Sequence, residues 1–312
     1  MHGTFARYSP LLFLTLLAFI AVRAEDATPL AALQAKGAKF KLNPAGAPLE
    51  VNAGATVMTT VEDYKLLGQL NTLVKVYLGG SKDVPLNDET VPALEKLDKV
   101  EIFFANGAEI SDDGMKAFES LKNLKQLGFD HWGWKIAGKG TVGAGLSHLA
   151  ALPNLQTVRF GGCRIDNKAC EALAQVKTLQ SIDLQHAFAV NDAGVAMLKT
   201  LPALRILKLS PQFSPRITDA TLASLGEVKT LEEIEINETC LSYEKGFANL
   251  KGLTALKKIT LTNIVTTEEE IAKLKADHAT AEVKWTKPDD VKAEKAKADL
   301  KKFQDAQTAA KK

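Results

Sequence analysis

Three segments of nine residues, 201–209 LPALRILKL, 228–236 VKTLEEIEI and 253–261 LTALKKITL, share the pattern L-x-x-L-x-x-L-x-L, with leucine, isoleucine or valine at the marked positions. Their second apolar positions, Leu204, Leu231 and Leu256, are 27 and 25 residues apart. A period between about 20 and 50 residues is typical of chains built from one stacked structural unit. This repeat therefore decides the fold class.

The same pattern extends over residues 66–285 at intervals of 24 to 31 residues. We place the starts of successive strands at Leu73, Val100, Leu124, Leu155, Leu179, Leu204, Leu231 and Leu256, with a degenerate ninth copy near Thr280. Each strand is followed by a polar turn and by residues that cap helix N-termini, namely Asn87-Asp88, Ser111-Asp112, Asp166-Asn167, Asn191-Asp192, Thr218-Asp219 and Thr266-Thr267. Apolar residues at helical spacing come next. One repeat is thus strand, turn, helix, turn.

A unit of this kind has one apolar face that it cannot bury alone, so neighbouring units must stack in series. Eight copies exceed the roughly three that stability requires. We therefore predict an α/β solenoid, with a curved parallel sheet on its concave face and helices on its convex face.

The repeat consensus resembles the leucine-rich repeat, in particular the ribonuclease-inhibitor-like and cysteine-containing types of exported bacterial proteins. The resemblance implies a scaffold that binds protein and carries out no catalysis, with a ligand that differs between members. In that family the third residue beyond the final strand leucine is often Asn or Cys, which caps the turn. Cys163 matches this position and Thr239 is a plausible substitute, whereas Ala108 and Ala187 depart from it.

The N-terminus has the pattern of a secretory signal peptide. Arg7 precedes an apolar run over 11–22, which ends in Val22-Arg23-Ala24 before Glu25-Asp26. The run is shorter than the roughly 20 residues that span a bilayer. We therefore expect cleavage near Ala24, export to the periplasm or the medium, and no transmembrane span in the mature chain. An uncleaved anchor is the alternative.

The remainder divides into an N-terminal cap over 25–62, the repeats over 63–285 and a tail rich in Lys and Ala over 286–312. In the cap we expect a short helix at 30–36 and a hairpin of strands at 38–42 and 49–52, which would cover the end of the core. Trp285 belongs to a shortened closing repeat. For the tail we favour a weak surface helix from Val291 onward over a solvated segment.

Charge and cysteine content narrow the function classes. Loss of Arg7 and Arg23 with the signal peptide reduces the 39 basic residues to 37, which equals the 37 acidic residues. A neutral chain has no global field that attracts nucleic acid. We expect all three cysteines, Cys163, Cys170 and Cys240, to be buried and unpaired. A disulfide bridge between Cys163 and Cys170 is the alternative.

Several local motifs invite a catalytic interpretation and do not sustain it. Gly138 to Gly143 satisfies G-x-G-x-x-G, but no acid ends the strand that follows, as a dinucleotide site requires. The histidines lack metal-ligand spacing. His131 and His186 lie two repeats apart, and two strand spacings put roughly 10 Å between them. We therefore predict no enzyme activity, no metal and no cofactor.

Alternation of side chains along the strands predicts which residues face the concave surface. The central outward column consists of Tyr77, Phe104, Gly128, Arg159, Asp183, Lys208, Glu235 and Thr260. One interpretation treats Arg159 beside Asp183, and Lys208 beside Glu235, as exposed ion pairs worth at most about 1 kcal/mol each. The other treats the column as a polar recognition surface with an aromatic end at Tyr77 and Phe104.

An insertion over 130–140, DHWGWKIAGKG, accounts for the longest interval between repeats. Insertions in repeat proteins collect on one face, often the binding face, and Trp is enriched at binding hot spots. We therefore predict a binding rim that consists of His131, Trp132, Trp134, His186, Phe188 and Phe213. The alternative is that both tryptophans fill the widened gap between repeats.

These observations predict a non-catalytic binding module outside the cytoplasm, with a protein as the favoured partner. Carbohydrate or cell-envelope binding is the alternative, because aromatic rings on a rim can stack on sugars. The intracellular ubiquitin-ligase adaptors of the resembled family are a second alternative. They carry a helical segment ahead of their repeats, and residues 25–62 do not look like one.

Overall fold

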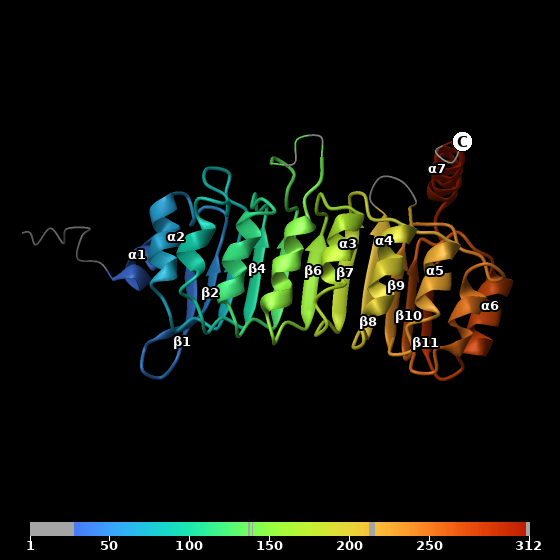
Figure 1. Ribbon diagram of the computed structural model, residues 1–312, viewed down its shortest axis with the longest axis horizontal. Helices are drawn as coiled ribbons and strands as arrows, with labels where there is room; N and C mark the ends of the chain where they lie inside the picture. Colours follow the sequence, from blue (N-terminus) through green and yellow to red (C-terminus); the bar gives the residue numbers. More distant parts are fainter. Residues whose placement is uncertain (1–27, 137, 139, 212–215, 310–312) are drawn as a thin grey trace, which may run out of the picture.

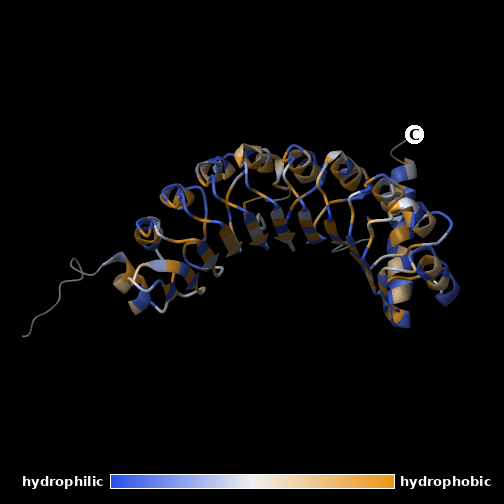
Figure 2. Cartoon of the chain, turned by 90° about the horizontal axis from the view of Figure 1, so that it is seen from below, coloured by the Kyte–Doolittle hydropathy of each residue, from blue (hydrophilic) through white to orange (hydrophobic). Residues whose placement is uncertain are grey.

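Strands in chain order form one continuous curved sheet in the computed structural model, which describes residues 28–136, 138, 140–211 and 216–309. The first pair is antiparallel and all later pairs are parallel. The strands of the described chain are β1 (Lys39–Leu42), β2 (Pro48–Ala53), β3 (Lys75–Leu78), β4 (Ile102–Asn106), β5 (Gln126–Asp130), β6 (Thr157–Gly161), β7 (Ser181–Ala187), β8 (Ile206–Pro211), β9 (Glu233–Asn237), β10 (Lys258–Thr262) and β11 (Glu282–Thr286). The strands line the inner side of an arc and the helices its outer side (Figures 1 and 2).

The helical elements of the convex face are of two kinds. The α-helices are α1 (Pro29–Ala35), α2 (Val61–Gly68), α3 (Asn167–Leu173), α4 (Asp192–Met197), α5 (Asp219–Leu225) and α6 (Glu268–Asp277). The 3₁₀ segments are η2 (Val91–Leu94), η3 (Gly114–Ser120), η4 (Ala144–Ala151), η5 (Leu198–Thr200) and η6 (Phe247–Gly252). Helix α7 (Asp290–Ala309) is a separate C-terminal α-helix.

The helix starts explain this division. Asp166, Asn191, Thr218 and Thr267 each cap an α-helix by accepting a hydrogen bond from its first turn, as the sequence predicts. The 3₁₀ segments have no side-chain cap. The predicted helices after Asn87-Asp88 and Ser111-Asp112 form as the 3₁₀ segments η2 and η3, and the side chains of Asn87 and Ser111 close local turns there.

Each repeat strand, from β3 to β11, begins two residues later than the sequence predicts. Leu124, for example, donates its backbone N–H to Leu121 O at 2.9 Å, and Leu231 donates likewise to Val228 O at 3.1 Å. These leucines therefore close the turn that ends the preceding helix, and they remain fully buried. The shift leaves the alternation of side chains unchanged because two residues is one full strand period.

The core runs without interruption from the cap to the last repeat. At the widened interval between Leu124 and Leu155 it contains an aromatic cluster, which consists of Phe103, Phe118, Phe129, Trp132 and Phe160. These rings fill the volume that the longer repeat adds.

Both ends of the solenoid are closed as expected. The antiparallel hairpin β1–β2 joins the sheet through β3, and Lys36 pairs with the buried carboxylate of Asp63. At the other end, Trp285 on β11 donates its indole N–H to Ile264 O at 3.0 Å. Helix α7 follows and has no buried residue, in agreement with a surface helix. It lies on the edge of the solenoid where the parallel strands end (Figure 1).

The described cysteines form no disulfide. Cys163 and Cys170 are buried and Cys240 is half-buried, so the alternative of a bridge between Cys163 and Cys170 is wrong. Burial raises the pKa of both buried thiols, that of Cys170 to about 12. In the part of the chain that the structure describes, no helix combines the length and apolarity needed to cross a membrane. The signal-peptide prediction lies outside the described residues.

Candidate functional site

The predicted concave column is one register row of the sheet. Tyr77 pairs with Phe104, Phe104 with Gly128, and Gly128 with Arg159. The row then continues through Asp183, Lys208, Glu235 and Thr260 and ends at Lys284. In the described chain no helix covers this face (Figure 2). The row is therefore a continuous strip of side chains open to a large partner.

The aromatic end of the row has a defined geometry. The rings of Tyr77 and Phe104 are parallel to within 6°, with centroids 6.0 Å apart. Gly128 makes room for this arrangement, since a Cβ there would lie 2.2 Å from Phe104 Cε1. The two rings line a hollow of about 250 Å³ together with Asn52, Asn106 and Asp130. The absence of a side chain at Gly128 therefore lets Phe104 lie flat on the sheet.

The middle of the row is a connected polar network. Arg159 donates from Nε to Asp130 Oδ1 at 3.0 Å, and its Nη1 lies 3.7 Å from Asp183 Oδ2. Lys208 lies 3.3 Å from Glu235, which also accepts from Gln185 Nε2 at 2.7 Å. The predicted neighbours are therefore in contact, and Gln185 adds a link that the column did not include.

Burial acts differently on the two carboxylates of this network. It raises the pKa of Asp183, and the hydrogen bond from Gln185 N–H offsets only part of that effect. For Glu235 burial also acts upward, but hydrogen bonds from Asn237 and Lys208 lower its pKa on balance. The neighbours of Glu235 thus favour its ionised form, whereas burial disfavours the ionised form of Asp183.

His131 and His186 occupy equivalent positions of their repeats: His131 directly follows β5, and His186 lies at the irregularity near the end of β7. Both have left-handed backbones, with φ of 57° and 59°, a conformation that side chains other than glycine rarely adopt. His131 Nδ1 lies 3.3 Å from Asn106 Oδ1, and His186 Nδ1 lies 3.0 Å from the hydroxyl of the buried Ser210. Each imidazole thus has its own hydrogen-bond partner.

Trp132 is a core residue, which corrects its assignment to the binding rim. Its exposed fraction is 0%, and it packs on Phe129 and Phe160. Its indole N–H donates to Ile110 O at 2.8 Å. Trp132 is the third residue beyond Phe129, so it takes the place that Cys163 and Thr239 take in their own repeats. The filler interpretation of the insertion is correct for this tryptophan.

Three different side chains, those of Trp132, Cys163 and Thr239, donate a hydrogen bond from this position of their repeats. Cys163 donates its thiol to Phe129 O at 3.2 Å and accepts from Trp132 N–H at 3.4 Å. The buried hydroxyl of Thr239 donates to Ile217 O at 2.6 Å. Both residues therefore cap backbone groups of the preceding repeat, as the resemblance implies.

Trp134 has a different environment on the rim. It is half-buried, donates its indole N–H to Gly162 O at 2.7 Å and meets Phe188 edge to face at 5.7 Å between centroids. The predicted rim thus brings Trp134 and Phe188 together. Phe213, predicted with them, lies outside the described residues.

Two arginines that the sequence reasoning missed complete this group. The guanidinium carbon of Arg164 lies 4.7 Å from the Phe188 centroid and 5.4 Å from that of Trp134. That of Arg216 lies 5.8 Å from the Phe188 centroid. Both arginines directly precede a buried isoleucine, Ile165 or Ile217. A search for charged residues at this repeat position would have found them.

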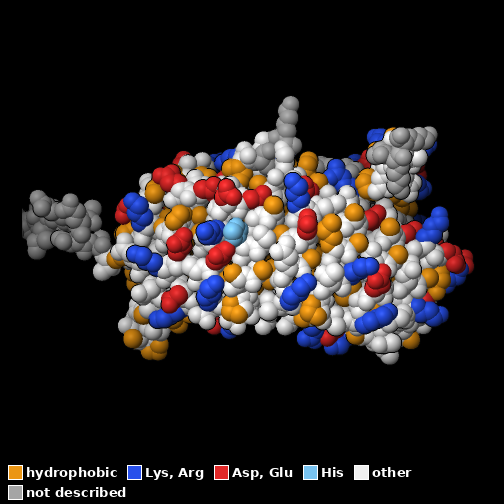
Figure 3. Space-filling view, viewed as in Figure 1, with side chains coloured by type: hydrophobic (Ala, Val, Ile, Leu, Met, Phe, Trp, Pro, Cys, Tyr) orange, Lys and Arg blue, Asp and Glu red, His pale blue; other side chains and the backbone are white. Residues whose placement is uncertain are grey.

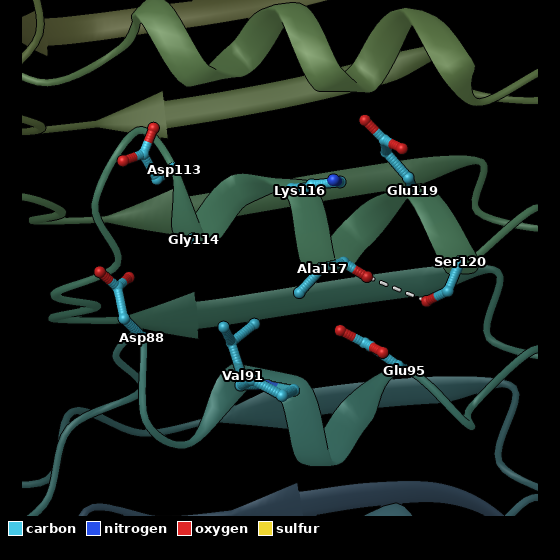
Figure 4. Close-up of a pocket in the computed structure, with 10 residues that line it drawn as sticks. Asp88, Val91, Glu95, Asp113, Gly114, Lys116, Ala117, Glu119 and Ser120 are labelled. Carbon is cyan, nitrogen blue, oxygen red and sulfur yellow. Dashed lines mark hydrogen bonds between the residues drawn. The ribbon is translucent and has the colours of Figure 1, made fainter.

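The convex face presents a different surface. Acidic and basic side chains are intermingled over it (Figure 3). Between η2 and η3 lies a shallow groove of about 340 Å³ with four acids, Asp88, Glu95, Asp113 and Glu119, and one base, Lys116 (Figure 4). Within the described residues, no group of three or more His, Cys, Asp or Glu side chains is placed to hold a metal ion. We assign this groove no ligand.

No protein-family model matches the chain, and no curated protein matches it in sequence. Similar solved structures include an internalin, InlF, from Listeria monocytogenes (15% identity over 72% of this chain and 71% of that chain, TM-score 0.46) and internalin C2 from the same bacterium (15% identity over 84% and 93%, TM-score 0.45). Another is TLR13 in the TLR13–ssRNA13 complex (17% identity, TM-score 0.52), where the match covers 76% of this chain and 35% of that chain.

The match to TLR13 and the repeat architecture establish the fold. The chain is an α/β leucine-rich repeat solenoid, as the sequence predicts. The likeness at this level of identity concerns the fold alone.

Proposed function

We propose that the protein is an exported, non-catalytic binding module that holds a protein partner against its concave face and the adjoining rim. The observation that carries this proposal is the register row from Tyr77 to Lys284 on the inner side of the arc, which no helix of the described chain covers. Its alternation of aromatic, basic and acidic side chains fits the mixed chemistry of a protein surface.

Rigidity supports the same conclusion. The row lies on a hydrogen-bonded sheet, and the Arg159 and Glu235 contacts hold its charged side chains in place. A partner that docks on such a surface orders few side chains, so little conformational entropy is lost on binding. Extended concave surfaces of this kind are the sites that solenoid proteins use.

The nearest approach to a catalytic arrangement is the contact between His186 and Ser210, and its geometry argues against catalysis. Ser210 Oγ has both His186 Nδ1 and His186 N–H as partners, and the serine is 3% exposed. A nucleophile must reach its substrate, so we assign Ser210 the role of holding the left-handed backbone of His186.

Carbohydrate binding is a second candidate because of one observation. The parallel rings of Tyr77 and Phe104 border a hollow that Asn106 and Asp130 also line, and flat aromatic surfaces are suited to stacking on sugars. The export that both candidates require is supported by the leader pattern of residues 1–24. The ribonuclease-inhibitor-like subtype is likewise an inference from the repeat consensus.

The test is a crosslinking pulldown from the extracytoplasmic fraction of the host, with the chain from Glu25 onward as bait. A Tyr77→Ala, Phe104→Ala variant changes the concave face. A Met197→Ala, Lys229→Ala variant changes exposed residues of the convex face and serves as the matched control. We expect a protein that the parent and the control retain and that the folded concave variant loses. Capture of polysaccharide alone would favour the second candidate, and equal capture by all three baits would refute the proposal.

A further inference from the structure

Four residues of the strand-end rim form what we call the rim cluster: Trp134, Arg164, Phe188 and Arg216. Phe188 lies at its centre, since the Trp134 ring meets it edge to face and both guanidinium groups lie within 6 Å of its centroid. The residues come from four successive loops, those that follow β5, β6, β7 and β8, and are brought together by stacking of the repeats. The rim cluster is therefore a product of the fold and not of one local motif.

Hydrogen bonds to the backbone fix three members of the rim cluster. Trp134 Nε1 donates to Gly162 O at 2.7 Å, Arg164 Nε to Gly140 O at 2.6 Å, and Arg216 Nη1 to Phe188 O at 3.0 Å. Since these side chains are held in place before any partner arrives, binding would cost little of their rotamer entropy.

The charge of Arg164 is not neutralised by the surrounding described chain, where no carboxylate oxygen lies within 4.0 Å of its guanidinium. The neighbouring acids have other donors. Asp166 accepts from Thr141 Oγ1 at 2.6 Å and from Lys168 N–H at 2.8 Å. Glu109 accepts from two backbone N–H groups at 3.0 Å. The residues between 136 and 216 that the structure does not describe include no Asp or Glu.

We propose that the rim cluster binds an acidic segment of a protein partner in which a carboxylate stands next to an aromatic or large apolar side chain. A guanidinium that lies over a ring keeps its edge available for a carboxylate, the geometry that arginine matches best. The rings of Trp134 and Phe188 offer apolar surface beside that charge. Trp and Arg are also the residue types most enriched at binding hot spots. This inference rests on the proposed function and specifies its partner.

A nucleic acid fits the rim less well than an acidic peptide. Polyanion binding requires a track of cations along the backbone, and affinity grows with each phosphate that is neutralised. Here Asp166, Asp192 and Glu238 lie along the same strand-end rim, and the chain from Glu25 onward has equal numbers of acids and bases. These acids interrupt the track of cations that a long polyanion would need.

The experiment selects random 12-residue peptides displayed on phage against the chain from Glu25 onward. Enriched peptides are then titrated by fluorescence anisotropy against the parent and an Arg164→Gln, Arg216→Gln variant. Lys168→Gln is the matched control, because it removes an exposed positive charge near the same rim. Trp134 reports directly on the location, so peptide-induced changes in tryptophan emission are compared between the parent and Trp134→Phe.

We expect the enriched peptides to combine Asp or Glu with an adjacent aromatic or large apolar residue. The double arginine variant should bind these peptides at least about tenfold more weakly than the parent, which corresponds to a loss of only about 1.4 kcal/mol in binding free energy. Lys168→Gln should change it less than about twofold, and the emission change should be lost in Trp134→Phe.

Three results would overturn the inference: peptides without acidic residues, peptides that bind the double arginine variant as tightly as the parent, or no enrichment. Tighter binding of a 20-nucleotide oligouridylate than of the best peptide would do the same. The proposed function is judged separately. If the concave Tyr77→Ala, Phe104→Ala variant still loses a pulldown partner while the rim variant retains it, the binding module stands and only the assignment of the rim fails.

Discussion

The indole N–H of Trp132 donates to the carbonyl oxygen of Ile110 in the preceding repeat, at 2.8 Å. This bond fixes the tryptophan inside the core, whereas Trp134, two residues later, lies half-buried on the rim. The insertion over 130–140 thus has two roles, since it fills the widened repeat and also presents an aromatic side chain to the outside.

The two tryptophans should therefore respond differently to truncation. Trp132→Ala leaves a cavity among Phe129 and Phe160 and an unpaired buried carbonyl, and we expect a loss of about 3–5 kcal/mol in the free energy of unfolding. Trp134→Ala should cost about 1 kcal/mol, because its side chain is only partly buried. Urea unfolding monitored by circular dichroism measures both. Equal losses would show that both tryptophans have the same structural role.

The hydroxyl of Thr239 should contribute measurably through its bond to Ile217 O. Thr239→Val preserves shape and leaves that buried carbonyl without its donor, so we expect a loss of about 1–3 kcal/mol in the free energy of unfolding. Thr239→Ser retains the donor and should lose less. A valine variant as stable as the serine variant would show that packing, and not this hydrogen bond, holds the turn.

Asp63 should make the stability of the cap depend on pH. Burial acts to raise its pKa, but hydrogen bonds from Lys36 and from Thr60 lower it on balance. Because the unfolded chain takes up this proton at a higher pH than the folded chain, acid favours unfolding. We expect Asp63→Asn to lose about 2 kcal/mol at pH 7.

The difference between the parent and Asp63→Asn should be fully present above about pH 4 and should disappear as the pH falls through the folded-state pKa. Urea unfolding of both proteins between pH 2 and 7 measures it. Lys41→Gln, which removes an exposed pair with Glu50 in the same cap, is the control and should have little effect. A difference that stays constant down to pH 2 would contradict this assignment.

Helix α7 should be dispensable for folding and should shield one thiol. It has no buried residue, whereas its Lys297 interacts electrostatically with the half-buried Cys240. Deletion from Pro288 onward should therefore change the midpoint of thermal unfolding by less than about 4 °C. It should also raise the rate at which Cys240 reacts with a thiol reagent, while the buried Cys163 and Cys170 stay unreactive.

Cys240→Ser in the full chain is the control for that labelling, since it should abolish the reaction. If the deletion leaves the rate unchanged, α7 does not cover Cys240. If it lowers the midpoint by 10 °C or more, the helix is part of the folding unit.

The sequence predicted the fold and the concave row well because a period of about 25 residues and a strand alternation of two leave little freedom. The row from Tyr77 to Thr260 follows from counting alone, and a two-residue error in the strand starts does not affect it. Helix caps predicted α-helices correctly at Asp166 and Thr218. At Asn87 and Ser111 the side chains close local turns instead, and the helices that follow are 3₁₀ segments.

The rim could not be predicted to the same accuracy because loops have no period. Trp132 and Trp134 look alike in sequence, and only the position of Trp132 three residues beyond Phe129 indicates its burial. Arg164 and Arg216 were missed because their cation–π contacts with Phe188 join loops of neighbouring repeats, which no local pattern reports.

The most direct test of the account is hydroxyl-radical footprinting of the chain with the partner that the pulldown identifies, because it reports which side chains the partner covers. We expect oxidation of Tyr77, Phe104, Trp134 and Phe188 to fall in the complex. Met197, exposed on the convex face, should be oxidised at the same rate in both states. Protection of Met197 with no change at Tyr77 and Phe104 would place the partner on the convex face and would contradict the central claim.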